Sequence, residues 1–301
     1  MGNLKEVRDR ISSVKSTQQI TKAMKMVAAA KLRRAQDKIT QMRPYAAKIK
    51  EMMQRLTASE QSDAAADTFT KEREVKRVLL VLVTGDKGLC GSFNSSVQKL
   101  LVKTIQEDYA TQFEKGNLDI ICIGKKGSEF LKSRGYELKS AYLDLFSDLT
   151  FDKVNDIASG ILADFKAEKY DKVEVIFNQF KNAAVFIPTR EQFLPMEGQK
   201  EEEMANAEAQ SKEAQNDYIL EPSGEEILEA LIPRSLRINF FRYVLDSNAA
   251  EHGARMTAMT QATDNAEDLL KDLKIKYNKE RQAAITNEIL EIVSGANALA
   301  G

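Results

Sequence analysis

The strongest constraint on the fold is a stripe of apolar and small side chains from Leu4 to Leu56, which recur at alternating steps of three and four. This spacing is close to the 3.5-residue period of a coiled coil and persists for more than seven heptads. At 1.5 Å per residue the helix is about 80 Å long. Only Pro44 interrupts the stripe, and it predicts a kink or a local break.

A second stripe with the same spacing runs from Phe241 to Tyr277. Ser223 is a suitable N-cap for its helix, and Gly295 is a suitable stop. Pro233 again predicts a kink, and the helix spans about 100 Å. One long helix at each end of the chain predicts an antiparallel intramolecular coiled coil, whose seam includes some polar positions.

Between the two stripes the pattern changes to short apolar runs separated by helical stretches. The runs are Val78–Val83, Ile120–Ile123 and Val173–Phe177, and the helical stretches lie near residues 97–113, 127–133 and 153–165. This alternation predicts a parallel sheet. A turn at Asn182 before residues 184–189 predicts a hairpin with an antiparallel edge strand.

The predicted fold is therefore α/β, with a long antiparallel coiled coil of N- and C-terminal helices and a Rossmann-like α/β central domain. We expect an N-terminal helix over residues 1–57, a central domain over 75–222 and a C-terminal helix over 223–299. Residues 197–217 contain seven acidic residues and two lysines, a net charge of −5, which indicates an exposed acidic insertion.

The scarce residues exclude several classes of function. The chain has one histidine, His252, and two cysteines, Cys90 and Cys122, so a Cys/His zinc site or a disulfide framework is not expected. The net charge of −1 gives no global reason to expect nucleic-acid binding. No run approaches the roughly 20 apolar residues of a membrane span.

One glycine-rich segment, Thr84–Asn94, follows a predicted strand and precedes a helix, where a phosphate-binding loop would lie. Its glycines are spaced G-x-x-G-x-x-G, which matches neither dinucleotide-binding nor Walker A patterns. A tight structural turn is favoured over nucleotide binding. Cys90, at the start of that helix, is favoured as a structural residue over a nucleophile, because no histidine is near in sequence.

The N-terminal helix concentrates positive charge. Residues 1–57 contain fourteen Lys and Arg and four Asp and Glu, a net charge of +10 in a chain whose total is −1. A solvated face is the simplest interpretation, but such concentration favours an acidic protein partner.

Several segments resemble the gamma subunit of F-type ATP synthases. Residues 15–32, KSTQQITKAMKMVAAAKL, resemble the N-terminal signature of that family, and residues 285–296, ITNEILEIVSGA, its C-terminal signature. Residues 254–259, 262–266, 277–283 and the 85–94 turn are also similar to the family, so the resemblance covers essentially the whole chain. The acidic stretch at 197–217 is a departure.

The resemblance implies a central rotor shaft inside a ring of three alpha and three beta subunits, with the α/β domain against the epsilon subunit and the c-ring. The chain would have no catalytic residue, cofactor or membrane span, and would be peripheral, on the cytoplasmic side of the bacterial inner membrane. The residues that match contact positions of the family are Lys22, Met24, Lys25, Arg255, Arg281, Gln282 and Thr286. Two alternatives remain: a nucleotide-dependent enzyme with an oligomerisation arm, and a coiled-coil scaffold.

Overall fold

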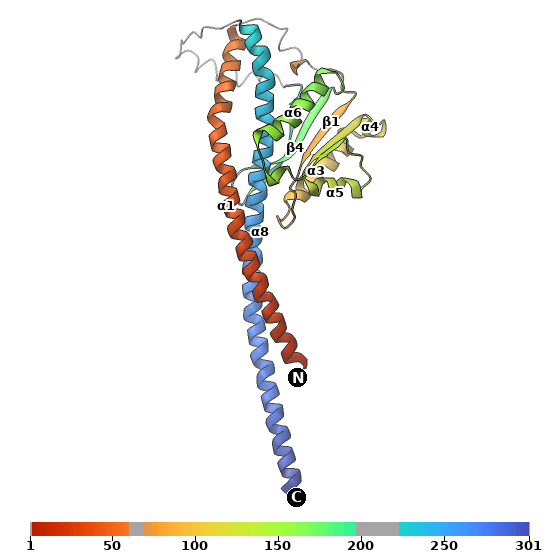
Figure 1. The fold of residues 1–301 in the computed structure, drawn as a ribbon. Helices are drawn as coiled ribbons and strands as arrows, with labels where there is room; N and C mark the ends of the chain where they lie inside the picture. Colours follow the sequence, from red (N-terminus) through yellow and green to blue (C-terminus); the bar gives the residue numbers. More distant parts are fainter. Residues whose placement is uncertain (1, 60–68, 72, 197–222, 301) are drawn as a thin grey trace. The chain divides into compact units, whose positions relative to one another are not determined.

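The computed structural model describes residues 2–59, 69–71, 73–196 and 223–300 (Figure 1). They form two compact units: Met1–Ala30 with Arg255–Gly301, and Lys31–Ala254. The long helices α1 (Gly2–Ser59) and α8 (Gly224–Ala300) contribute to both. The second unit also holds β1 (Val78–Val83), α3 (Phe93–Glu107), α4 (Ala110–Glu114), β2 (Leu118–Ile123), α5 (Lys125–Ser133), β3 (Ser140–Tyr142), the 3-10 turn η1 (Leu145–Ser147), α6 (Phe151–Lys166), β4 (Lys172–Phe180) and β5 (Phe186–Leu194).

The second unit is built on a mixed five-stranded sheet in the order β3-β2-β1-β4-β5. β1 pairs in parallel with both β2 and β4, so that Val81 lies opposite Ile121 and Val175. Every residue of β1 is buried, as expected for a continuous apolar run inside a parallel sheet. β5 is antiparallel to β4. The three predicted strands and the hairpin at Asn182 are therefore confirmed.

Two local features differ from the expectation. The edge strand β3 was not predicted, because its three residues, Ser140–Tyr142, contain no apolar run. The single helix expected near residues 97–113 is two helices, α3 and α4. The chain bends between them to bury Tyr109, whose hydroxyl donates to the Glu174 carboxylate of β4 at 2.8 Å.

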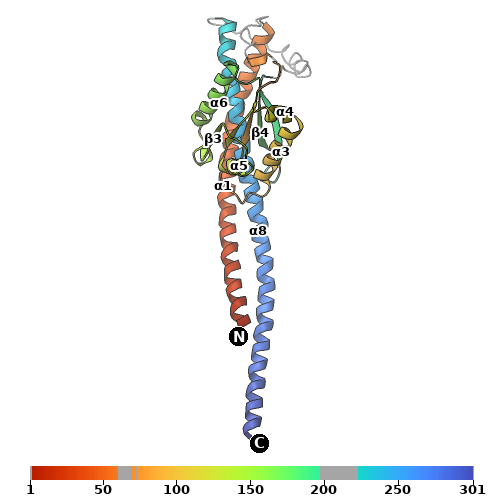
Figure 2. The same cartoon turned by 90° about the vertical axis from the view of Figure 1, so that its right-hand side faces the viewer.

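Helices cover both faces of the sheet, which lies between α3 and α5 on one side and α8 on the other (Figures 1 and 2). On the first side, Leu82 of β1 packs in one buried cluster with Leu101 of α3 and Leu131 of α5. On the second side, the Tyr243 ring of α8 lies 4.7 Å from that of Phe177, measured between centroids. The α/β elements therefore hold this part of α8 through a buried aromatic contact.

The start of α8 agrees with the expectation, whereas the course of α1 at Pro44 does not. The amide of Glu226 donates to Ser223 Oγ at 3.2 Å, which confirms Ser223 as the N-cap of α8. Pro44 and Pro233 lie inside continuous helices, so the alternative of a local break at Pro44 is wrong. Burial of Ile39 and Ile49 on either side of Pro44 offsets the roughly 3 kcal/mol that an internal proline costs.

The expected stop at Gly295 is also wrong, because α8 continues to Ala300. A glycine inside a helix costs only about 1 kcal/mol relative to alanine. Nothing lies within 4 Å of the position where a Cβ of Gly295 would be, so no contact forces the chain to turn there. The helix therefore extends through it.

The first unit is a pair of antiparallel helices, formed by the start of α1 and the end of α8. Every predicted stripe position from Leu4 to Ala28 and from Met256 to Tyr277 is buried or half-buried. Ala28 and Ala266, both buried, allow the helices to approach closely. The predicted packing of the two terminal helices is confirmed, and it includes polar positions such as Thr21.

The acidic insertion expected at residues 197–217 lies outside the described residues. The division of the chain into an N-terminal helix over residues 1–57, a central domain over 75–222 and a C-terminal helix over 223–299 stays a prediction.

Candidate functional site on the terminal helices

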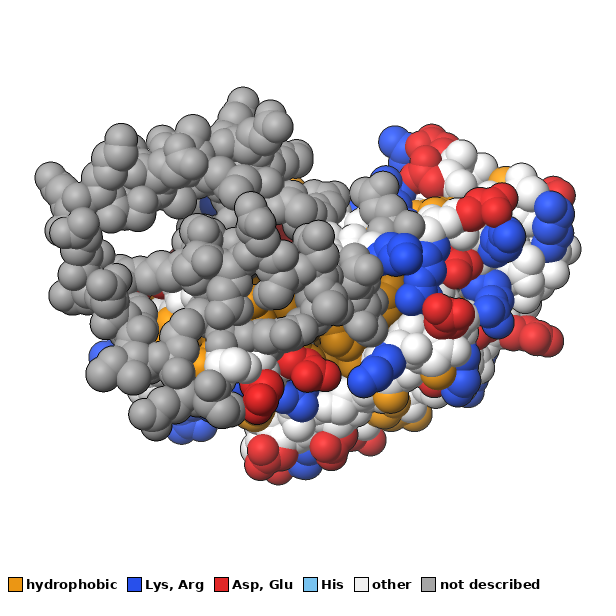
Figure 3. All heavy atoms as spheres, turned by 90° about the horizontal axis from the view of Figure 1, so that it is seen from above, with side chains coloured by type: hydrophobic (Ala, Val, Ile, Leu, Met, Phe, Trp, Pro, Cys, Tyr) orange, Lys and Arg blue, Asp and Glu red, His pale blue; other side chains and the backbone are white. Residues whose placement is uncertain are grey.

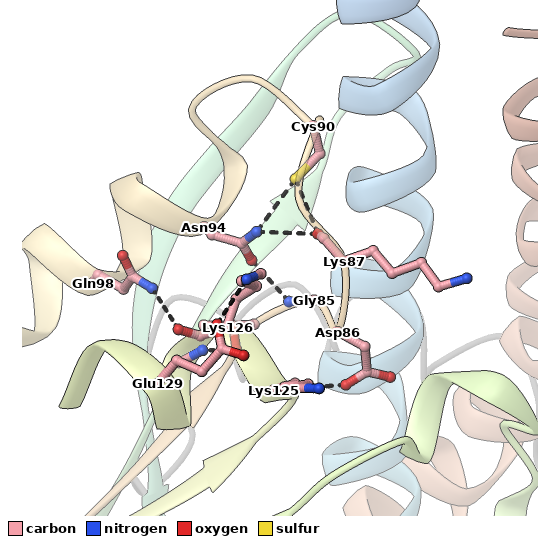
Figure 4. Close-up of polar contacts among 11 residues, drawn as sticks. Gly85, Asp86, Lys87, Cys90, Asn94, Gln98, Lys125, Lys126 and Glu129 are labelled. Atoms are coloured by element: carbon pink, nitrogen blue, oxygen red, sulfur yellow. Dashed lines mark hydrogen bonds and ion pairs between the residues drawn. The ribbon is translucent and has the colours of Figure 1, made fainter. Parts of the chain in front are cut away.

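The glycine-rich segment Thr84–Asn94 connects β1 to α3 in a tight turn (Figure 4). The Gly85 amide donates to Asn94 Oδ1 at 2.9 Å, which ties the start of the turn to the first turn of α3. Leu89 and Gly91 have φ angles of 61° and 59°, in the left-handed region. This geometry is that of the structural turn, the favoured of the two interpretations.

Side chains at the end of β1 and the start of the glycine-rich segment also occupy backbone donors at the start of α5. Asp86 Oδ1 accepts the amide of Lys125, the first residue of α5, at 3.0 Å (Figure 4). Thr84 Oγ1 accepts the amide of Gly127 at 2.9 Å. The N-terminus of α5 thus already holds a carboxylate of its own chain, where a bound anion would otherwise be stabilised. These contacts tie the glycine-rich segment to α5, as expected of a structural turn.

The surroundings of both cysteines are those of structural residues rather than of nucleophiles. Cys90 is buried, and its Sγ lies 3.3 Å from Asn94 Nδ2 and 3.7 Å from the Lys87 carbonyl oxygen. Burial raises the pKa of the Cys122 thiol to about 12, so it stays protonated and is a poor nucleophile. Among the described residues, no group of three His, Cys, Asp or Glu is placed to hold a metal ion.

All seven predicted contact residues lie in the first unit, on the helix pair. The exposed members are Lys22, Arg281, Gln282 and Thr286, and the half-buried ones are Met24, Lys25 and Arg255. Thr286 Oγ1 donates to the Gln282 carbonyl at 2.9 Å, so these two residues are joined along one helix face.

The end of α8 exposes an apolar face that the sequence reasoning missed. The exposed fractions of Ile285, Ile289, Ile292 and Val293 are 47, 55, 70 and 50%. Their spacing of four, three and one residues places them on one face of the helix, as a continuation of the face that carries Arg281 and Gln282. The spacing was present in the sequence, but the predicted stripe ended at Tyr277 and did not include these residues.

This apolar face (Ile285, Ile289, Ile292 and Val293) is an uncommon feature for a chain acting alone. Contiguous exposed apolar side chains mark contact surfaces for other molecules. The seam of the coiled coil is a different face, because Leu270 and Leu273 are buried against α1. The end of α8 therefore presents a second apolar surface outside the seam.

The start of α1 presents unneutralised positive charge. No Lys or Arg from Lys5 to Arg34 forms an ion pair within 4.0 Å with any residue that the structure describes. Over the α/β elements, by contrast, acidic and basic side chains are interspersed on the face shown in Figure 3. The concentration of charge found in the sequence is thus available on the helix for an acidic partner.

These features define a class of protein. A helix pair with a basic helix and an exposed apolar end acts through contacts with other chains. The chain is a mechanical or structural subunit.

Comparisons with known proteins identify the family. The family model described as ATP synthase matches residues 3–299. The ATP synthase gamma chain of Cytophaga hutchinsonii is 51% identical over 299 residues, covering 99% of both chains, and that of Flavobacterium psychrophilum is 52% identical over 301 residues, covering 100% of both. A chain from the central stalk and c-ring structure of the Tetrahymena thermophila mitochondrial ATP synthase is similar in fold, with a TM-score of 0.58 and 27% identity, covering 81% of this chain and 99% of that one.

The chain belongs to the ATP synthase gamma chain family. It is a non-catalytic subunit of the central stalk, the rotor of F1Fo ATP synthase, and the resemblance seen in the sequence is confirmed. This subunit belongs to the F1 sector, which is peripheral to the membrane. None of the described helices combines the length and apolar character required to cross a bilayer.

Proposed function

We propose that this chain transmits torque between the ion-driven c-ring and the catalytic beta subunits, during both synthesis and hydrolysis of ATP. The helix pair stands inside the ring of alpha and beta subunits, and the α/β elements contact the epsilon subunit and the c-ring. The complex places the chain on the cytoplasmic side of the bacterial inner membrane. The observation that carries this proposal is the exposed apolar face of α8. Its side chains are removed from water only if another chain encloses them.

The physical requirement for such a rotor is a surface that differs from side to side. Three chemically identical beta subunits take different nucleotide states only if their contacts with the rotor differ in free energy. By linkage, nucleotide binding then acts back on the rotor angle. The end of α8 has this asymmetry: Ile289 and Ile292 lie on one side, whereas Lys276 and Asn287 lie on the opposite side.

The seven contact residues divide into two sets in this proposal. Lys22, Met24 and Lys25 of α1 face an acidic loop of beta, because their lysines have no carboxylate partner within the described chain. Arg281 and Gln282 contact the catalytic ring together with the apolar face, and Thr286 flanks them. Arg255 belongs to the same set, and it lies closer in sequence to the α/β elements than Arg281 and Gln282 do.

The direct test is the double variant Arg281→Ala with Gln282→Ala in a reconstituted ATP synthase. Loss of these contacts lowers torque and turnover at least severalfold, while the unfolding free energy of the chain changes little because both side chains are exposed. Unchanged torque and turnover would contradict the assignment.

A matched control is available on the same helix. Lys276→Ala with Asn287→Ala also removes one exposed cation and one exposed amide. These residues lie five positions before Arg281 and five after Gln282, which places them about 140° away around the helix in each case. The control should reduce turnover less than the test pair. A coiled-coil scaffold would instead form a homo-oligomer alone, whereas a rotor is present once per complex.

A further inference from the structure

A cavity of about 500 Å³ opens in the second unit, between α1, α6 and α8. Its walls include the rings of Tyr45, Phe151 and Phe241, with the Phe151 and Phe241 rings 5.3 Å apart and nearly perpendicular. Lys38 Nζ donates to the Leu149 carbonyl at 2.9 Å, which joins α1 to the segment that precedes α6. The volume is within the range of sites that bury a sizeable group of a ligand or partner.

Two arginines border this aromatic cavity and give it a positive charge. Arg234 lies over the Tyr45 ring, 5.6 Å from its centroid, and Arg237 follows three residues later on the same face of α8. Neither guanidinium forms an ion pair or hydrogen bond with any residue in the described part of the chain. The cavity has no carboxylate in its lining. Its electrostatic complement is therefore an anionic group.

The aromatic part of the same lining favours an occupant that also carries an apolar group beside its anionic group. Tyr45 and Phe151 are 44 and 42% exposed, so aromatic surface faces water at the rim of the cavity. Aromatic rings with arginine are the composition of the central contacts in protein–protein interfaces. Because this chain is one subunit of a large complex, the fitting occupant is a segment of another protein chain.

We propose that the Tyr45–Arg237 cavity, lined by Tyr45, Phe151, Phe241, Arg234 and Arg237, docks an Asp or Glu side chain next to a large apolar side chain from a subunit that turns with this chain. This inference rests on the proposed rotor function. A stationary ring of three identical contacts would not keep this cavity filled through a rotation. A partner fixed to the rotor turns with the cavity and therefore stays in it.

Photocrosslinking in the assembled ATP synthase tests this proposal. With p-benzoylphenylalanine at position 45, irradiation is expected to join the chain to a peptide in which Asp or Glu lies within two residues of a large apolar residue. ATP hydrolysis should continue after crosslinking, because two parts of one rotor can be joined without stopping it. The same photoreactive residue at position 185, where Val185 is 45% exposed in the hairpin, is the control and should not give this peptide.

Charge variants distinguish the arginines from the aromatic rings. Arg234→Glu with Arg237→Glu should lower the crosslink yield at least tenfold, while Arg234→Lys with Arg237→Lys keeps most of it. The proposal is overturned by an undiminished yield in the Glu pair, by no crosslink at position 45, by a peptide without an acidic residue, or by a loss of hydrolysis in proportion to yield. Torque in the Arg281 and Gln282 variants is measured separately, so a failed rotor function and a failed docking site give different results.

Discussion

The hydroxyl oxygens of Thr21 on α1 and Thr263 on α8 lie 2.9 Å apart, across the seam of the helix pair. Thr21 is buried and also donates to the Gln18 carbonyl at 3.0 Å, and Thr263 lies 2.7 Å from the Met259 carbonyl oxygen. A single polar contact in an apolar seam favours one register of two helices over its neighbours. We interpret this pair as a register contact for the shaft.

A double-mutant cycle measures that contact. Thr21→Val and Thr263→Val should each lower the unfolding free energy of the chain by about 1 kcal/mol, because each leaves one hydroxyl without its partner across the seam. The double variant should cost less than the two single variants added together. Thr286→Val is the control, since Thr286 makes the same kind of bond along its own helix but is exposed. Strict additivity in urea unfolding would show that the two hydroxyls do not interact.

The helical glycines Gly253 and Gly295 should respond oppositely to alanine. A Cβ on Gly253 would lie 2.8 Å from the Ala183 carbonyl oxygen, in a hairpin held by Asn182 Oδ1, which accepts the amides of Ala184 and Val185. We expect Gly253→Ala to destabilise the chain by about 1 kcal/mol, because overpacking outweighs the gain in helix propensity. Gly295→Ala meets nothing within 4 Å and should increase helicity by circular dichroism. If Gly253→Ala instead raised the unfolding free energy, the hairpin that carries Ala183 would be able to move away from the added methyl group without a measurable loss of stability.

The helices and the central strands were predictable because their signals are periodic and local. Residues such as Ala28 and Leu270 follow the coiled-coil period and are buried, and Val78–Val83 is apolar throughout and buried throughout. The specific pairing of Thr21 with Thr263 was not predictable. Antiparallel register between segments about 240 residues apart depends on the chain that joins them, which no local pattern encodes.

The candidate site was only partly predictable for a related reason. The occupied N-terminus of α5 needs Asp86 after β1 and Lys125 after β2, and only the parallel pairing of those strands brings them together. The apolar face at Ile289 had the right spacing, but spacing alone does not distinguish a seam within the chain from a surface for another chain. The motif resemblance supplied the seven contact residues, and these stay predictions.

Asp246 should make the stability of the chain depend on pH. Burial raises the pKa of this α8 carboxyl from its ordinary 3.8 to about 6, with Glu191 acting in the same direction and Arg242 and Arg43 against it. A raised carboxyl pKa means that this group's stabilising contribution is fully present below pH 3.8 and is lost as the pH rises through about 6. At 1.36 kcal/mol per pKa unit, the loss at pH 7.5 is on the order of 2–3 kcal/mol.

The variant Asp246→Asn removes this dependence. Urea unfolding should show it to be more stable than the parent chain at pH 7.5, by an amount that shrinks steadily as the pH is lowered from 6 towards 4. Asp156→Asn, which removes an exposed carboxylate of α6, serves as the control. An equal difference between variant and parent at pH 7.5 and pH 4 would refute the assignment of this titration to Asp246.

The apolar face of α8 gives the last prediction. Ile289 and Ile292 are 55 and 70% exposed, so Ile289→Asp with Ile292→Asp should change the unfolding free energy of the chain by no more than about 0.5 kcal/mol. In the assembled complex the same pair should lower ATP turnover at least tenfold, because carboxylates would enter an apolar enclosure without partners. Asn287→Asp places a carboxylate on the other side of the helix and should lower turnover much less. Normal turnover in the double variant would mean that this face stays in water in the complex, and the enclosure proposed for the end of the shaft would have to be abandoned.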